Sequence, residues 1–306
     1  MVRRTSRFMR NEVLGCFACC GAMSLLSRRK LTPRWSFETR DEQTIIWKLL
    51  VSSAGILVGE ERNVEAKQGS LFAINIKTGV TLWRDTVLPE PWWFGIEKAT
   101  KDTLFVQTFR SPNLPEPKGI IALDITTGAL RWQDADVAYL FLAEGKVYAI
   151  RQGFSHREYL TLFPDTGAII DNFGSDSAPV EIARGLIDEH DPFTHFAERV
   201  RSGEPFQSAC RLIDTVSSAD ELRGAIESLE RGSYRVLAYH RRAEGAQARL
   251  QNVLRSELAV FDRERVVFQE TLAKETPLAL PDNFFLSHDH LLYVKDKRVL
   301  TAVALS

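Results

Sequence analysis

Two groups of side chains in the first third of the chain have the residue types and spacing of a binding site. Trp92 and Trp93 follow Pro91, and on a strand neighbouring side chains point to opposite faces, so one indole is expected in the core and one on the surface. An exposed Trp stacks on ligands or anchors protein contacts. Glu60 and Arg62 share one face of a predicted inner strand, where they would bind a polar ligand or form a structural ion pair. The candidate ligand-binding residues are therefore Glu60, Arg62, Trp92 and Trp93.

The remaining reactive residues match no catalytic or metal-binding motif. His288 and His290 lie two residues apart, but a metal ion would need further ligands from elsewhere, and a β-turn at Asp289-His290 is the alternative. Three of the four cysteines lie within residues 16–20, with no His or further Cys pair nearby to complete a zinc site. The chain contains no G-x-S-x-G, H-E-x-x-H, Walker or dinucleotide motif. We therefore predict no catalytic residue, no metal site and no cofactor, and leave enzymatic activity open.

An internal repeat predicts the elements that position the candidate residues. Residues 73–83 read AINIKTGVTLW and residues 122–132 read ALDITTGALRW, and both fit the pattern A-x-[ND]-x-x-T-G-x-x-x-W. A degraded third copy, TLFPDTGAIID, occupies residues 161–171. A β unit that recurs every 40–50 residues or so is typical of a propeller blade.

Each copy of the repeat is predicted to form a β-hairpin. Gly79 can take the positive φ that a tight hairpin turn requires. The Asp124 carboxylate can accept hydrogen bonds from amides of its own turn. Trp83 and Trp132 follow their turns on the next strand, where an aromatic side chain can pack back on the sheet. We therefore expect these two tryptophans at equivalent places in successive blades.

The repeat resembles the tryptophan-docking repeats of quinoprotein-like β-propellers. More narrowly, the chain is similar to a bacterial family known only as a domain of unknown function. Six segments carry that similarity: I-W-K-L-L (46–50), L-V-G-E-E-R (57–62), P-W-W-F-G-I-E (91–97), S-P-N-L-P (111–115), K-G-I-I-A-L-D (118–124) and F-F-L (284–286). The similarity extends over residues 33–175 and 282–305 and is poor over residues 176–255. It implies a WD40-like propeller fold, and it implies no activity, because the family has none to transfer.

The predicted fold is all-β, a β-propeller of about five blades, with four to six blades compatible with the strand pattern. It spans residues 33–306. The short aromatic segment 34–37 is expected to add the outer strand of the last blade and so close the ring. The propeller is interrupted by a helical insertion or a diverged blade at about residues 177–232.

Three helices are predicted in and around this interruption. Residues 222–229 place Leu222, Ala225, Ile226 and Leu229 on one helical face, after a capping signal at residues 218–221. Residues 180–186 and 193–200 are weaker helix candidates.

The first 32 residues are interpreted as a leader or a disordered N-terminal extension. Four arginines precede a short apolar stretch at residues 13–26, as in a signal peptide. However, Ser27-Arg28-Arg29-Lys30 follows at once, without a clear cleavage site. We therefore expect a cytoplasmic protein, with export through an atypical signal as the alternative.

The composition argues against a nucleic-acid partner bound through bulk charge and against a transmembrane segment. The 39 Lys and Arg residues balance 40 Asp and Glu residues, which argues against nucleic-acid binding through bulk charge. No apolar run is long enough to predict a transmembrane helix. The expected partner is therefore an unidentified protein or a small-molecule ligand.

These observations favour a non-catalytic propeller that acts as a binding scaffold. The alternative is a hydrolase or lyase that uses carboxylates in the central channel. A quinone-dependent dehydrogenase, implied by the repeat resemblance, is more remote. Such enzymes have about eight blades, the upper end of the usual propeller range, together with bound calcium and an adjacent cysteine pair on the cofactor. Here the adjacent pair, Cys19-Cys20, lies in the leader.

Overall fold

The computed structural model of the chain describes residues 30–110, 116–153, 156–187, 191–243 and 253–305. Within these residues, 22 β-strands form five antiparallel sheets. The predicted all-β class is therefore confirmed. The proposed leader, and the S-P-N-L-P segment at 111–115, lie outside the described residues.

The first three sheets correspond to the three copies of the repeat. Sheet 1 contains β2 (Thr44–Val51), β3 (Ile56–Asn63), β4 (Gln68–Asn75) and β5 (Thr81–Thr86). Sheet 2 contains β6 (Phe94–Ala99), β7 (Thr103–Phe109), β8 (Pro117–Asp124) and β9 (Leu130–Asp134). Sheet 3 contains β10 (Val137–Ala143), β11 (Lys146–Gln152), β12 (Arg157–Leu162) and β13 (Ile169–Gly174). In each sheet the Thr-Gly turn joins the third and fourth strands, as the sequence predicted.

The other two sheets have five strands each, and sheet 5 combines strands from distant parts of the chain. Sheet 4 contains β15 (Glu198–Val200), β16 (Leu222–Arg231), β17 (Tyr234–Arg242), β18 (Leu254–Asp262) and β19 (Arg265–Thr276). Sheet 5 has the order β1 (Pro33–Glu38), β22 (Val299–Ala304), β21 (His290–Lys295), β20 (Phe284–Ser287) and β14 (Thr194–Phe196). The pairing of β1 with β22 confirms that the segment at 34–37 supplies the outer strand of the last sheet.

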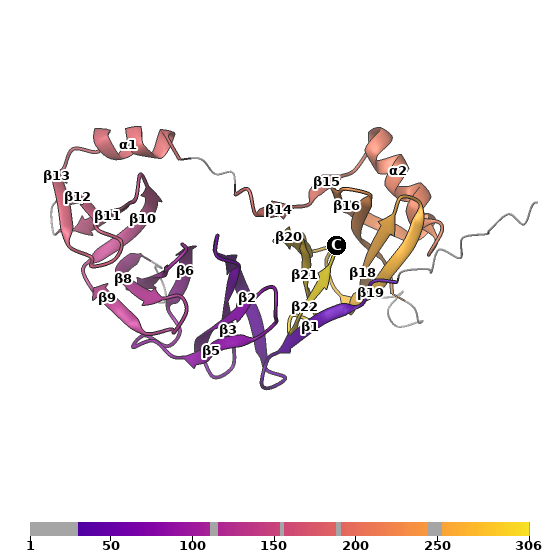
Figure 1. Cartoon of the computed structure of the whole chain (residues 1–306), viewed down its shortest axis with the longest axis horizontal. Helices are drawn as coiled ribbons and strands as arrows, with labels where there is room; N and C mark the ends of the chain where they lie inside the picture. Colours follow the sequence, from indigo (N-terminus) through magenta and orange to yellow (C-terminus); the bar gives the residue numbers. More distant parts are fainter. Residues whose placement is uncertain (1–29, 111–115, 154–155, 188–190, 244–252, 306) are drawn as a thin grey trace, which may run out of the picture.

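The five sheets stand side by side in an open arc, in the order 3, 2, 1, 5 and 4 (Figure 1). In this view β2, β6 and β10 line the inner side of the arc, and β5, β9 and β13 lie on its outer side. A hydrophobic core fills each space between neighbouring sheets. Between sheets 1 and 2, for example, Val58 and Leu71 pack near Ile96 and Val106.

The arc does not close into the ring that we expected. Instead, a helix covers the outward face of each end sheet. Helix α1 (Ala178–Gly185) buries Val180 against Phe141 and Tyr148 of sheet 3. Helix α2 (Gly203–Ile213) buries its apolar side against sheet 4. In stacked repeat proteins, capping elements solve the same problem, since an end repeat otherwise exposes an apolar face.

Trp83 and Trp132 occupy equivalent positions, as predicted, and each joins its sheet to the next one. The indole Nε1 of Trp83 donates a hydrogen bond to the carbonyl of Ile125 in sheet 2, at 2.8 Å. Trp132 Nε1 donates in the same way to the carbonyl of Pro164 in sheet 3, at 2.7 Å. In both cases the acceptor lies three residues before the glycine of the Thr-Gly turn.

The turn glycines allow this close approach of the indole rings. Gly128 and Gly167 have φ values of +71° and +70°. A Cβ atom on Gly128 would lie 2.8 Å from the ring of Trp83, and one on Gly167 would lie 2.6 Å from the ring of Trp132. The glycine therefore serves both the backbone conformation and the packing of the tryptophan.

Trp35 on β1 is a third member of this series, which the sequence pattern did not include. Its Nε1 donates to the carbonyl of Ile76 at 2.6 Å, and a Cβ atom on Gly79 would lie 2.3 Å from its side chain. The same contact thus joins sheet 5 to sheet 1. β1 is the first strand of the described fold and pairs with β22, the last one, so it links the two ends of the chain.

The predicted helices are correct at one place and wrong at two. The candidate at 180–186 is α1, but residues 193–200 form the short strands β14 and β15, and residues 222–229 lie in β16. A register shift between Arg223 and Glu227 breaks the two-residue alternation of β16, so its apolar residues mimic a helical spacing. No helix among the described residues combines the length and apolar character that a membrane span needs.

Candidate functional site

The structure brings Glu60, Arg62 and Trp92 together where sheets 1 and 2 meet. Arg62 Nε and Nη2 donate to Glu60 Oε2, at 3.1 and 2.9 Å. Arg62 Nη1 donates to the Trp92 carbonyl at 2.7 Å, and Nη2 also donates to the Phe94 carbonyl. Glu60 Oε1 accepts a hydrogen bond from the Ile96 amide at 2.7 Å. The buried pair therefore forms the structural ion pair that the sequence left open, and it holds the start of β6.

Gln107 on β7 occupies the position in sheet 2 that Glu60 occupies in sheet 1. Its Oε1 accepts a hydrogen bond from the Tyr139 amide of β10, at 2.6 Å. Its Nε2 donates to the carbonyl of Gly119 at 2.8 Å. A buried polar side chain at this position thus binds the innermost strand of the next sheet in both places, which supports a structural role for Glu60.

Trp92 and Trp93 differ from the expectation that one is buried and the other exposed. That expectation required a strand, whereas both residues lie in a bend just before β6, and both are partly buried. Their ring centroids lie 6.5 Å apart in an edge-to-face arrangement. The Arg62 guanidinium carbon lies 5.1 Å from the Trp92 ring centroid.

Trp47, which no sequence pattern singled out, is the most exposed aromatic side chain near this pair. Its exposed fraction is 60%, and its ring centroid lies 5.6 Å from the Arg62 guanidinium carbon. Ile46 pairs with Glu61 and Lys48 with Glu60, so Trp47 is the extra residue of a β-bulge on β2. Bulges re-aim side chains and are common beside functional sites. We call Trp47, Trp92 and Trp93, together with Arg62, the tryptophan cluster.

The innermost strands of sheets 2 and 3 also carry one bulge each. Glu97 is the extra residue on β6 and Leu140 is the extra residue on β10. The shared I-x-K pattern at 46–48 and 96–98 was the available sequence signal. Leu140 packs into the core beneath α1. Of the three bulge residues, Trp47 and Glu97 are therefore the two that can contribute to a surface on the inner side of the arc.

Glu97 adds an acidic group beside the tryptophan cluster. Burial raises the pKa of its carboxyl, the Lys48 ammonium partly offsets this rise, and the Glu60 carboxylate adds to it. Lys48 Nζ itself donates to the Ile96 carbonyl at 2.5 Å. The inner side of the arc therefore presents an exposed indole next to one acidic and one basic side chain.

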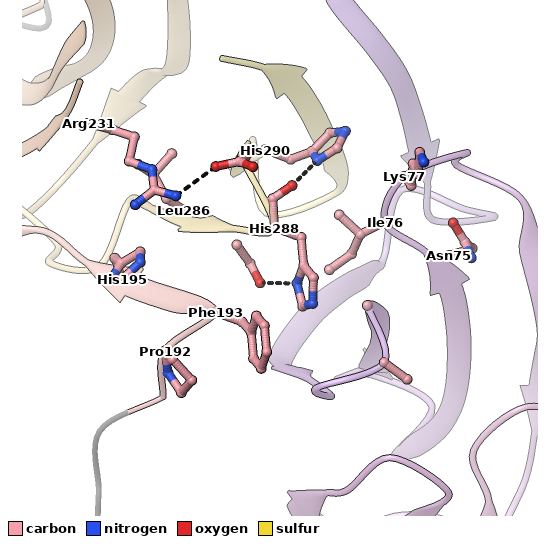
Figure 2. Close-up of a pocket in the computed structure, with 14 residues that line it drawn as sticks. Asn75, Ile76, Lys77, Pro192, Phe193, His195, Arg231, Leu286, His288 and His290 are labelled. Carbon is pink, nitrogen blue, oxygen red and sulfur yellow. Dashed lines mark hydrogen bonds and ion pairs between the residues drawn. The ribbon is translucent and has the colours of Figure 1, made fainter. Parts of the chain in front are cut away.

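A pocket of about 620 Å³ lies between sheets 1 and 5, beside β14, the edge strand of sheet 5 (Figure 2). His195, His288 and His290 are among its lining residues. The β-turn expected at Asp289-His290 lies one residue earlier, at His288-Asp289, and His290 begins β21. In the described part of the chain, no three His, Cys, Asp or Glu side chains are placed to hold a metal ion.

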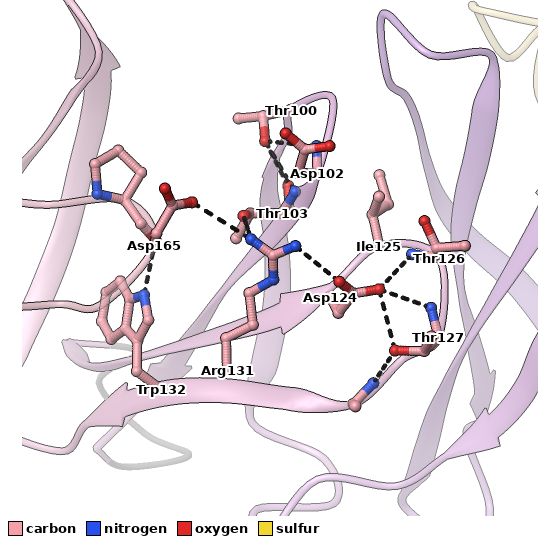
Figure 3. Close-up of polar contacts among 12 residues, drawn as sticks. Thr100, Asp102, Thr103, Asp124, Ile125, Thr126, Thr127, Arg131, Trp132 and Asp165 are labelled. Carbon is pink, nitrogen blue, oxygen red and sulfur yellow. Dashed lines mark hydrogen bonds and ion pairs between the residues drawn. The ribbon is translucent and has the colours of Figure 1, made fainter.

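The polar side chains around Asp124 stabilise the repeat turn (Figure 3). Asp124 Oδ1 accepts hydrogen bonds from the amides of Thr126 and Thr127, at 3.0 and 2.9 Å. Its Oδ2 accepts one from Arg131 Nη2 at 2.7 Å. The Arg131 contact and the turn amides lower the pKa of Asp124, against a smaller opposing effect of burial. In sheet 1, Asn75 makes the same turn contact through its amide oxygen.

We expect Asp124→Asn to lower the free energy of unfolding by about 1 kcal/mol at pH 7, because it keeps the turn acceptor but loses the partly exposed ion pair with Arg131. The carboxylate contributes fully above the ordinary pKa of Asp and loses its contribution as the pH falls through the lowered folded pKa. The difference between the two proteins should therefore vanish in acid. Urea unfolding from pH 7 to pH 2 measures it, and a difference that persists at the lowest pH would contradict the assignment.

A domain family of unknown function, DUF4905, matches residues 51–132 of the chain. This match covers the hairpins of sheets 1 and 2, where the sequence similarity to such a family was noted. No curated protein matches the chain.

Several solved structures are similar to the chain at low identity. The β-propeller domain of the Trilobed protease from Pyrococcus furiosus, described as having an open velcro topology, matches 86% of this chain and 94% of its own, at 9% identity and a TM-score of 0.32. BBS1N, in a complex with ARL6DN, matches 87% of this chain and 67% of its own, at 9% identity and a TM-score of 0.26. A bifunctional GH43-CE protein from Bacteroides eggerthii matches 91% of this chain but 34% of its own, at 11% identity and a TM-score of 0.26. We transfer no binding or catalytic property from them.

Proposed function

We propose that this chain is a non-catalytic binding module, built as an open β-propeller in which the five sheets are the blades. Its contact surface is the tryptophan cluster on the inner side of the arc. The docking of Trp35, Trp83 and Trp132 on Thr-Gly turns supports the relation to tryptophan-docking propeller repeats.

The exposure of Trp47 is the observation that carries this proposal. A fully hydrated indole is unfavourable, and the chain places this one at a bulge, where the strand alternation would otherwise have turned a side chain to the core. The Arg62 guanidinium lies near its ring, at a distance typical of a cation–π contact. The exposed part of the ring is therefore available for a ligand that presents a flat apolar group, such as a proline, an aromatic side chain or a sugar ring.

The geometry favours a binding role over a hydrolase that uses channel carboxylates. Such a mechanism requires two carboxyl groups that are free to exchange protons or attack substrate. Both oxygens of Glu60 are already engaged, by Arg62 and by the Ile96 amide. Glu97 would therefore lack Glu60 as the second carboxyl group that such a mechanism needs.

We expect Trp47→Ala to weaken ligand binding strongly without unfolding the protein. Peptide and glycan arrays would identify ligands of the full chain, and titration would give their affinities. Loss of the indole should weaken binding by about 2 kcal/mol or more, which is roughly 30-fold, while the free energy of unfolding should change by less than about 0.5 kcal/mol.

Phe163→Ala is the matched control, because it removes another exposed aromatic side chain, from the turn between β12 and β13. Trp47→Phe should retain part of the affinity. The proposal is wrong if the arrays yield no ligand that depends on Trp47, or if the control weakens binding as much as Trp47→Ala does.

A further inference from the structure

The second site in the structure is the pocket beside β14, and five separate segments of the chain build it. Its volume of about 620 Å³ lies within the range of small-molecule sites, roughly 300–1,000 Å³. Ala54 and Lys77 come from turns of sheet 1, His195 from β14, Arg231 from the end of β16, and Asp289 from the β20–β21 turn. The pocket is thus a feature of the assembled sheets and is separate from the tryptophan cluster.

The charged groups that line this pocket are mostly basic. Lys77 and Arg231 face a single carboxylate, that of Asp289. Arg231 Nη2 donates to Asp289 Oδ1 at 2.8 Å, and within the described residues its Nε and Nη1 have no other partner (Figure 2). A guanidinium that is held at one corner retains the donors needed to bind an anion.

Two of the three histidines on the pocket wall, His288 and His290, are held in defined orientations. His290 Nδ1 lies 2.7 Å from the His288 carbonyl oxygen, and since that oxygen can only accept, Nδ1 carries the proton. The His288 ring stacks on Phe193, with centroids 5.0 Å apart and planes within 7°. Its Nδ1 lies 3.0 Å from Ser287 Oγ. These contacts fix the polar atoms of the wall before any ligand arrives.

The turn that carries these groups is a tight hairpin turn. His288 and Asp289 have φ values of +48° and +60°. Two-residue hairpin turns of this kind need positive φ, which Asp and His adopt more readily than most other non-glycine residues. The turn thereby places an imidazole and a carboxylate on the pocket wall.

We propose that this pocket binds a small molecule that carries one carboxylate or phosphate group on an apolar body. Arg231 and His195 hold the anionic group. Ala54, Pro192 and the exposed side of Phe193 contact the apolar body. A lining that combines apolar walls with a few convergent polar groups is the usual composition of a small-molecule site.

Calorimetric titration of the full chain with benzoate, phenyl phosphate and benzyl alcohol tests the proposal. At least one of the two anions should bind with a dissociation constant of about 1 mM or below, and the neutral alcohol should bind at least 10-fold more weakly. Comparison of benzoate with phenyl phosphate shows which anionic group the pocket accepts. The site assignment is overturned if neither anion binds, or if benzyl alcohol binds as well as they do.

Two variants test where the anion binds, and a third variant serves as the control. Arg231→Gln removes the charge, and Ala54→Trp fills the pocket from an exposed turn without changing any charge. Each should weaken anion binding at least 10-fold. Arg211→Gln, which removes another exposed, singly paired arginine, from α2, should leave the affinity unchanged. Circular dichroism and thermal unfolding confirm that each variant folds, and equal binding by all three variants would place the anion elsewhere.

Discussion

Replacing Trp132 with alanine should lower the free energy of unfolding by about 3–5 kcal/mol, as is typical for a large aromatic side chain removed from a packed core. The side chain is 9% exposed, and its ring packs 6.2 Å from that of Phe105, between centroids. The substitution also leaves the Pro164 carbonyl without its indole donor and opens the space above Gly167. Urea or thermal unfolding of the purified variant measures the loss.

Trp47→Ala is the matched control for this experiment, because it makes the same substitution at an indole that is mostly exposed. It should change the free energy of unfolding by less than about 0.5 kcal/mol. A Trp132→Ala protein as stable as the wild type would show that Trp132 does not hold sheets 2 and 3 together. It would then be a candidate binding residue instead.

The first three sheets could be predicted from the sequence because their turns are encoded locally. The Thr-Gly turn requires a glycine at positive φ, and in sheets 1 and 2 a side-chain acceptor lies three residues before the Thr, so both features leave a visible pattern. Sheet 4 has no such turn pattern. Its strand β16 was mistaken for a helix because a bulge shifts its register, which is a property of its pairing with β17 and not of its composition.

The open arc could not be predicted because ring closure depends on contacts between the two ends of the fold. The strand count and the β1 segment were compatible with a ring. Helices α1 and α2 instead cover the two end sheets, and α2 was not expected at its observed position. Buried apolar residues of α2, such as Ala209 and Ile213, carry no sign in the sequence of which sheet face they cover.

The candidate site was partly accessible from the sequence. Strand counting placed Glu60 and Arg62 near the P-W-W segment, and the contact between Arg62 and Trp92 confirms that the two groups meet. Trp47 was missed because an extra residue at a bulge follows neither strand nor helix periodicity. The anion pocket could not be predicted because residues that meet there, such as Gly55 and His288, lie far apart in the sequence.

The second large effect is expected at the buried ion pair of sheet 1. Glu60→Ala should lower the free energy of unfolding by about 3–5 kcal/mol, since removing one partner of a buried pair leaves the other charge uncompensated. The Arg62 side chain is 9% exposed, so water cannot easily replace the carboxylate. The Ile96 amide would lose its acceptor as well, which loosens the start of β6. Urea unfolding gives the value.

A double-mutant cycle separates the pair from its surroundings. Glu60→Ala combined with Arg62→Ala should be less destabilising than the sum of the two single changes, because the double variant leaves no unpaired charge. The exposed pair of Glu204 and Arg211 on α2 is the control, and breaking it should cost less than about 1 kcal/mol. If Glu60→Ala is as mild as that control, the ion pair does not hold the two sheets together. Glu60 and Arg62 would then be available to a ligand, and the contact surface would extend beyond the three tryptophans. A large loss with strong coupling would instead leave Trp47 as the main ligand contact of the tryptophan cluster.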